Sequence, residues 1–107
     1  MAKTARMIQI EALLADDPDD AFLRYGLAME HASIGDDAAC VEVLRDLIAR
    51  TAAAPYIPAF LQAGQALLRL DRVTEACDVL RRGIEAARNA GDLHALSEMQ
   101  ALLDAHG

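Results

Sequence analysis

Apolar residues recur along this chain every three or four positions, which is the spacing of helices with one buried face. No run of alternating β-branched residues predicts a strand. The pattern predicts an all-α fold of about six helices in a single domain at 1–107. Its predicted parts are an N-terminal helix at 4–16, a first helical hairpin at 20–50, a second helical hairpin at 58–89 and a C-terminal capping helix at 92–105.

Turn residues mark the ends of these predicted helices. Asp17-Pro18 ends the first one, because the residue before a proline is pushed out of the helical region. Gly35-Asp36 and Leu70-Asp71-Arg72 are predicted to be the tight turns inside the two hairpins. Residues 51–58 form the linker between hairpins, and Pro58 suits the first turn of the helix that follows.

The N-terminal helix carries a stripe of apolar residues and is therefore expected to dock on the core. The stripe consists of Met7, Ile8, Ile10, Leu13 and Leu14. The acidic run 16–20 that follows has two interpretations. A calcium loop needs a glycine at its turn and a late glutamate, which this run lacks, so helix capping is the favoured one.

One set of residues recurs at a fixed step of 36 positions. In the central hairpin the set is Phe60, Ala63, Gly64, Leu67, Ala76 and Leu80. One step earlier it is Arg24, Leu27, Ala28, His31, Cys40 and Leu44, and one step later it is Leu96, Met99, Gln100 and Leu103. A single helical hairpin cannot bury its apolar face alone, so near copies of it stack. We expect these positions to pack the repeats together, with Gly64 letting its helix approach Ala76 closely.

The central set resembles a tetratricopeptide repeat, whose pattern is W-x2-L-G-x2-Y and then A-x3-F. Phe60, Ala63, Gly64 and Leu67 stand at the four positions of the first part, and Ala76 and Leu80 at the two of the second. The resemblance is to small bacterial tetratricopeptide repeat (TPR) proteins. It implies a right-handed α-solenoid of antiparallel helical hairpins and a role in protein–protein interaction.

The first hairpin departs from the repeat pattern at two positions. Arg24 replaces the large aromatic residue, and we expect it to lie along apolar surface with its charged head in water. His31 replaces the tyrosine, and we expect a packed core histidine whose buried nitrogen has a hydrogen-bond partner. In the last helix Gln100 stands in the place of Gly64, which fits a terminal element with a wettable outer face.

Composition narrows the possible functions. The net charge of −7 argues against nucleic-acid partners, which need a basic surface. No stretch of about 20 apolar residues predicts a membrane span, and no signal peptide is visible. Two cysteines, Cys40 and Cys77, are too few for a stapled secreted domain, so free thiols in the cytoplasm are expected.

Catalytic motifs are absent from the sequence. The three histidines have no metal-ligand spacing, and neither cysteine has an adjacent base or a Cys-x-x-Cys partner. No phosphate-cradling glycine loop occurs. We therefore expect no enzyme activity, no metal and no cofactor.

The resemblance places the partner-binding groove on the first helix of each hairpin. The groove residues expected there are Phe22, Tyr25, Met29, Leu61, Gln65 and Leu68. The first three form one stripe that either faces a partner or is covered by the first helix or by the linker 52–56. The basic residues that clamp chaperone tails in some family members are missing here.

Three functions stay open at this stage. The first is an adaptor for a peptide or helix, preferring a partner with basic flanks because Asp19, Asp20 and Glu30 are expected to form an acidic rim. The second is a module that associates with itself as a homodimer. The third is a small acidic chaperone of the secretion type.

Overall fold

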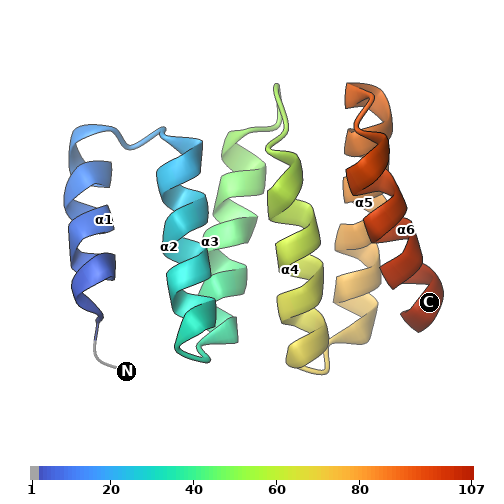
Figure 1. The fold of residues 1–107 in the computed structure, drawn as a ribbon, viewed down its shortest axis with the longest axis horizontal. Helices are drawn as coiled ribbons and strands as arrows, with labels where there is room; N and C mark the ends of the chain where they lie inside the picture. Colours follow the sequence, from blue (N-terminus) through green and yellow to red (C-terminus); the bar gives the residue numbers. More distant parts are fainter. Residues whose placement is uncertain (1–2) are drawn as a thin grey trace.

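The computed structural model describes residues 3–107, and these form six α-helices and no strand (Figure 1). The helices are α1 (Ala5–Asp16), α2 (Ala21–Ser33), α3 (Asp37–Arg50), α4 (Ile57–Arg69), α5 (Val73–Ala90) and α6 (Leu93–His106). They stand side by side in a row in which each helix runs opposite to the one before it. The predicted all-α fold of stacked hairpins is confirmed.

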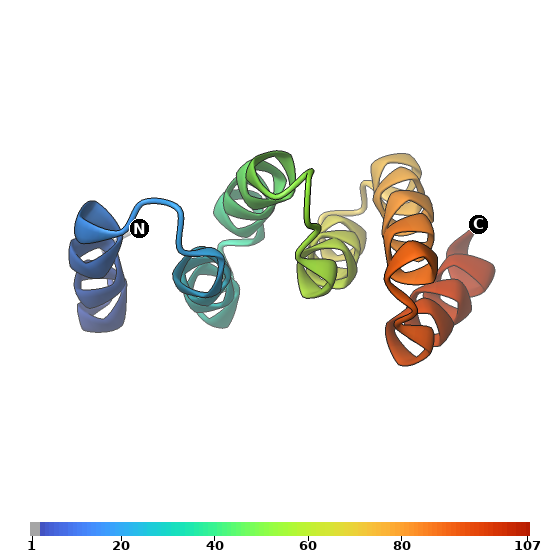
Figure 2. The ribbon, with the colours of Figure 1, turned by 90° about the horizontal axis from the view of Figure 1, so that it is seen from above.

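The row of helices has two layers, as the view from above shows (Figure 2). Helices α2, α4 and α6 lie on one side, and α3 and α5 lie on the other. Each helix packs against its neighbours in the chain. Helix α4 also contacts α6 directly, although α5 separates the two in the sequence. The first helix of every hairpin therefore contributes to the same surface of the molecule.

Capping explains where these helices begin. The carboxylates of Asp20, Asp36 and Asp92 accept hydrogen bonds from backbone N–H groups three residues later, at 2.9, 3.2 and 3.1 Å. Asp20 thus gives the acidic run its predicted capping role. The starts of the first helices follow the 36-residue step: α2, α4 and α6 begin at residues 21, 57 and 93.

The two hairpin turns share one backbone conformation at equivalent positions. Gly35 has a φ of 80°, and Asp71, which lies 36 residues later, has a φ of 60°. Glycine takes this left-handed conformation without strain, and aspartate is among the few other residues that tolerate it. A glycine in the second turn is thus not needed, although the two turns have the same shape.

Small residues allow the helices of the central hairpin and its neighbour to approach closely. A Cβ atom on Gly64 would lie 2.6 Å from Cδ2 of Leu80, so Leu80, and not the expected Ala76, is the close neighbour of this glycine. A Cβ atom on Gly83 would lie 2.5 Å from Cβ of Phe60 and from the sulfur of Met99. Gly83 therefore holds α4, α5 and α6 together at one point.

The positions of the 36-residue set are buried to different degrees. Fully or almost fully buried are Ala28, Cys40, Leu44, Phe60, Ala63, Gly64, Leu67, Ala76, Leu80 and Met99. Leu27, Leu96 and Leu103 are half-buried. The most complete burial lies in the central hairpin, because it has a neighbouring hairpin or helix on both sides.

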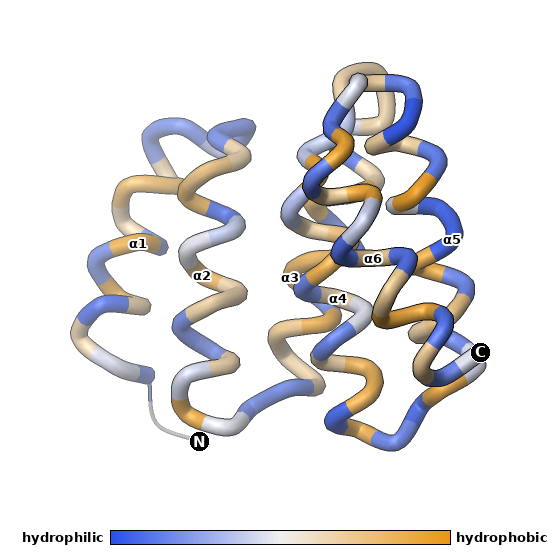
Figure 3. Tube along the Cα trace, turned by 45° about the vertical axis from the view of Figure 1, so that its right-hand side comes forward, coloured by the Kyte–Doolittle hydropathy of each residue, from blue (hydrophilic) through white to orange (hydrophobic). Residues whose placement is uncertain are grey.

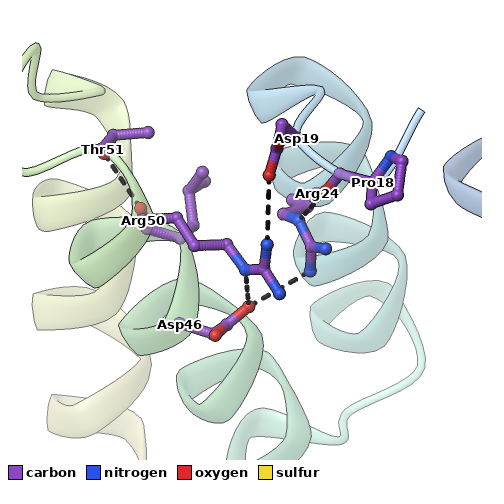
Figure 4. A network of polar contacts seen from close by, with 7 residues as sticks. Pro18, Asp19, Arg24, Asp46, Arg50 and Thr51 are labelled. Carbon is purple, nitrogen blue, oxygen red and sulfur yellow. Dashed lines mark hydrogen bonds and ion pairs between the residues drawn. The ribbon is translucent and has the colours of Figure 1, made fainter.

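Arg24 does not leave its head in water, contrary to the prediction. Its Nε donates to the carbonyl oxygen of Pro18 at 2.7 Å, and its Nη1 pairs with Asp46 at 3.1 Å, so only 17% of the side chain is exposed (Figure 4). Arg50 joins the same network through Asp46 at 2.8 Å and Asp19 at 3.3 Å. The network ties the segment before α2 to α3, where the other repeats use apolar side chains.

His31 also differs from the prediction. Its Nδ1 atom is buried and has no hydrogen-bond partner among the described residues. An unsatisfied buried nitrogen costs about 1–3 kcal/mol. The equivalent positions in the next two first helices hold Leu67 and Leu103, so an apolar side chain suits this place in the repeat.

The N-terminal helix docks as expected, but through fewer residues. Met7 and Ile10 of α1 are buried, and Oγ1 of Thr4 donates to Glu30 of α2 at 3.0 Å. Ile8 and Leu13 are exposed, by 58% and 49%, so the predicted stripe is wrong for these two residues. Helix α1 is attached to α2 by one narrow face.

Replacing Gly83 with alanine is expected to cost about 1–3 kcal/mol of unfolding free energy, because the new methyl group meets Phe60 Cβ, which cannot swing away. Gly26→Ala is the matched control: its Cβ would lie at an ordinary 3.7 Å from Ile10, so higher helix propensity should give a gain of up to about 1 kcal/mol. Urea denaturation measures both. Equal effects of the two substitutions would contradict the close approach at Gly83.

Replacing His31 with leucine is expected to raise the free energy of unfolding by about 1–2 kcal/mol, since it removes the unsatisfied Nδ1 from the interior. His94→Leu is the control, because 87% of the His94 side chain is exposed. Thermal and urea denaturation of both variants would check this. A loss of stability in His31→Leu would show that the imidazole has a favourable role in the packing.

Candidate binding groove

Two adjoining pockets form a hollow between α4 and α6 on the side shared by the first helices. The first has a volume of about 230 Å³ and also reaches Tyr25 of α2 and Asp92 before α6. The second has a volume of about 380 Å³ and continues along α4 and α6 toward Ala105. Leu61 and Glu98 line both pockets, so we treat them as one feature, the α4–α6 groove.

Helical spacing explains which side chains line this groove. Ile57, Leu61 and Gln65 follow one another at steps of four along α4. Glu98, Ala101, Leu102 and Ala105 do the same at steps of three and four along α6. The tube in Figure 3 shows these two helices next to each other, each with apolar stretches between polar ones. Three of the α6 residues that line the groove, Ala95, Ala101 and Ala105, are alanines, and their short side chains leave space between the two helices.

Small residues on α6 leave the second pocket open. Ala101 and Ala105 are exposed and stop at Cβ, so the space beside Gln65 and Leu61 stays unfilled. A longer side chain at either alanine would project into this space. The floor of the groove is thus apolar, and its shape depends on two short side chains.

The structure places only part of the predicted groove set in this feature. Tyr25, Leu61 and Gln65 line the groove. Met29 and Leu68 are half-buried and pack against the core instead. Phe22 is 72% exposed in the first turn of α2 and lines neither pocket.

Tyr25 is held in place by the linker between α3 and α4. Its ring lies 5.4 Å from the ring of Tyr56, centroid to centroid, at an interplanar angle of 46°. The backbone N–H of Tyr56 donates to Oγ1 of Thr51 at 3.3 Å, which fixes the linker. Burial, and then the neighbouring Tyr56, raises the pKa of Tyr25, so its hydroxyl stays neutral at physiological pH. The linker therefore covers one side of this ring while the other side faces the groove.

The charges that line the groove are acidic. Asp92 and Glu98 carry carboxylates, and neither pocket has a lysine or an arginine among its lining residues. His94 lies 2.8 Å from Glu98, with Nε2 facing the carboxylate oxygen Oε1. Asp92 is engaged as the cap of α6 and lines only the first pocket, whereas Glu98, beside His94, lies at the junction of the two pockets. Glu98 is therefore the carboxylate best placed to meet a ligand.

The three acidic residues predicted to form a rim make contacts within the fold instead. Asp19 pairs with Arg50, Asp20 caps α2, and Glu30 accepts a hydrogen bond from Thr4. Each of these carboxylates is bound to a neighbouring segment of the chain. The acidic character of the groove comes from α6 instead.

Sequence reasoning assigned α6 to capping and missed its contribution to the groove. The signal was the same 36-residue step that revealed the repeat. One step after Gln62 is Glu98, and one step after Gln65 is Ala101. Both pairs line the groove, because equivalent positions on α4 and α6 face the same side of the molecule.

The chemistry available in the described part of the chain is that of contact and charge. Among residues 3–107, no three His, Cys, Asp or Glu side chains are grouped in a way that could hold a metal ion. Burial raises the pKa of the Cys40 thiol to about 11, so this thiol is protonated at neutral pH. Within the same range, every helix is too short or too polar to cross a membrane.

Several solved structures are similar to this chain. The solution structure of a tetratricopeptide repeat domain protein from Salinibacter ruber has a TM-score of 0.71 and 33% sequence identity, and it covers 80% of this chain and 85% of that one. Its crystal structure has a TM-score of 0.69 at 33% identity, over 78% of this chain and 92% of that one. The solution structure of a protein from Bordetella parapertussis has a TM-score of 0.76 and 27% identity, over 95% of this chain and 87% of that one. No family model matches the chain, and no curated protein matches it significantly.

Replacing Tyr25 with alanine is expected to lower the free energy of unfolding by about 2–4 kcal/mol, because the ring packs against Tyr56 and the core. Phe22→Ala is the matched aromatic control, and its effect should stay within about 0.5 kcal/mol since its ring is exposed. Urea denaturation of the two variants measures both changes in the free energy of unfolding. A loss as large for Phe22→Ala as for Tyr25→Ala would show that the two rings share one buried environment.

Proposed function

Because this chain belongs to the tetratricopeptide repeat family, we propose that it is a non-enzymatic adaptor whose α4–α6 groove binds a helix or peptide of another protein. The observation that carries the proposal is the pair of adjoining pockets with a common border at Leu61 and Glu98. Two neighbouring pockets of this kind receive successive apolar side chains of one partner segment. This is how a helix or peptide docks in a groove.

The composition of the groove supports an apolar partner segment that also carries a basic residue. Leu61, Ala101 and Leu102 offer apolar contact, and Glu98 offers a carboxylate at the centre. A lysine or arginine beside the apolar residues of the partner would pair with Glu98 after binding. Such complementarity mainly raises the association rate and the specificity.

The same composition argues against two other kinds of ligand. A C-terminal carboxylate or a phosphate group would need a cation in the groove, and the lining residues include no lysine or arginine. The net charge of −7 adds a general repulsion of nucleic acids. Protein segments without an excess of acidic residues are therefore the favoured partners.

A photo-crosslinking residue tests the proposal directly. We expect p-benzoylphenylalanine at Gln65, inside the groove, to give cross-links to another protein in the native host cells. The matched control places the same residue at Ala49, an exposed position of α3 that lines neither pocket. Mass spectrometry identifies the linked peptides.

A second change in the same protein shows whether the cross-links depend on the groove. Ala101→Arg puts a long cation into the second pocket at an exposed helical position, so it should reduce the Gln65 cross-links about tenfold, equal to about 1.4 kcal/mol, without loss of stability. Equal cross-linking from Gln65 and Ala49, or no response to Ala101→Arg, would refute a groove-bound partner.

A further inference from the structure

The two pockets of the α4–α6 groove differ in their walls and in their charge. The first pocket lies between three helices, because Tyr25 of α2 lines it together with residues of α4 and α6. Its lining includes the carboxylates of Asp92 and Glu98. The second pocket has walls from α4 and α6, and its surface is mainly apolar through Leu61, Leu102 and two alanines. The two pockets therefore suit side chains of different chemistry.

The arginines of the three helices around the first pocket are engaged with the other layer. The arginines of α2, α4 and α6 are Arg24 and Arg69, and these helices contain no lysine. Arg24 pairs with Asp46 at 3.1 Å, and Arg69 pairs with Asp37 at 3.0 Å. Both carboxylates belong to α3, which lies on the opposite side of the row (Figure 2). The acidic side chains at the first pocket are thus not neutralised by an arginine of these helices.

Glu98 is accessible to a cation from outside. Its side chain is exposed, and its partner within the described chain is His94, which lies 2.8 Å from Oε1. The His94 side chain is itself exposed, so it can turn away without disturbing the core. Asp92 uses one oxygen to accept the N–H of Ala95, and it adds a second negative charge at the same pocket. The charge of this site is complementary to a basic side chain.

The other walls of the first pocket favour arginine among the basic side chains. Ile57, Pro58 and Leu61 of α4 offer apolar contact for a methylene stem. The ring of Tyr25 lines the pocket from the side of α2, where Tyr56 supports it. A guanidinium is planar, stacks on aromatic rings and binds a carboxylate through two hydrogen bonds, whereas the ammonium of lysine is a point charge. An arginine side chain therefore matches both the apolar and the acidic walls.

The positions of the lining residues give the distance between the two pockets. Along α4 the first pocket precedes the second by about one turn, and along α6 by about two turns. The rise of a helix then places the pocket centres about 5–10 Å apart along the groove. In a partner helix that lies along the groove, residues four positions apart span about 6 Å and residues seven positions apart about 10 Å. Both pairs lie on one face of a helix.

We propose that the first pocket binds an arginine side chain of the partner segment and that the second pocket binds a large aliphatic side chain four or seven positions away from it. The guanidinium pairs with Glu98 and lies against Tyr25, while the methylene stem contacts α4. The inference rests on the proposed function, because it assigns the chemistry of the partner that binds in the same groove.

Selection from a phage-displayed library of random peptides, about 12 residues long, on the immobilised full chain tests this assignment. We expect the bound peptides to be enriched in arginine, with leucine, isoleucine or methionine four or seven positions away. The same selection on Glu98→Gln should lose the enrichment in arginine and keep that in aliphatic residues, because the substitution removes charge from the first pocket and leaves the second pocket unchanged.

A double-mutant cycle with the tightest-binding selected peptide assigns its arginine to the first pocket. The arginine of the peptide and Glu98 are each replaced with glutamine, and isothermal titration calorimetry gives the dissociation constants of the four combinations. Each single change should weaken binding about tenfold, and the second change should add little to the first. Glu42→Gln is the matched control, since Glu42 is an exposed carboxylate of α3 that lines neither pocket, and it should leave the affinity unchanged.

Ala101→Leu tests the second pocket. Leucine fills this pocket without a change in charge, so it should weaken binding about tenfold whether or not the peptide keeps its arginine. Ala49→Leu on α3 is the matched control and should bind like the wild-type protein. Both positions are exposed, so circular dichroism should show an unchanged fold.

Several results would overturn the inference. They are a selection that yields no peptide, selected peptides in which lysine replaces arginine or a basic residue is missing, and equal effects of Glu98→Gln and Glu42→Gln. The cross-links from Gln65 separate this failure from that of the adaptor function. Cross-links to another protein together with any of these results leave the adaptor standing with a partner of different composition. Binding of peptides that depends on their arginine, without cross-links in the cells, supports the pocket assignment and removes the adaptor.

Discussion

The fold depends on how closely three helices approach one another around Gly83. The missing side chain there allows Phe60 of α4 and Met99 of α6 to meet the backbone of α5. Because α4 and α6 both pack against α5 at this glycine, they also contact each other directly. The hollow between them lies at the surface, where the alanines of α6 leave the space open. Packing in the interior thus shapes the surface on which the α4–α6 groove lies.

The first hairpin achieves its packing by other means. Where the later repeats have Phe60 and Leu96, it has Arg24, and the guanidinium joins a loop carbonyl and the carboxylate of Asp46. Hydrogen bonds of this kind demand specific partners and directions, whereas apolar contacts tolerate small shifts. The polar network therefore fixes the geometry between the loop before α2 and α3. The apolar seams of the later repeats mainly supply stability.

The fold could be predicted from the sequence because periodic apolar residues and a constant step of 36 residues encode stacked helical hairpins. The predictions that were wrong concern contacts between individual side chains, which the periodic pattern does not determine. His31 was expected to find a hydrogen-bond partner, but no acceptor or donor from another helix reaches its Nδ1. Of the residues predicted to bind a partner, Tyr25, Leu61 and Gln65 line the α4–α6 groove. Glu98 and Ala101 were missed because a terminal helix was interpreted only as a cap.

The narrow attachment of α1 implies that resistance to opening is uneven along the chain. Met7 and Ile10 are buried outside the main cluster of core residues, whereas α4 and α5 lie at its centre. Detaching α1 exposes few apolar side chains, so it requires less free energy than opening the central hairpin. Backbone amides of α1 would then exchange their hydrogens with water through this local opening, while those of α4 exchange only when the whole molecule unfolds. The protein thus has a graded stability, with its most readily released helix at one end of the row and its most firmly held pair beyond α2 and α3.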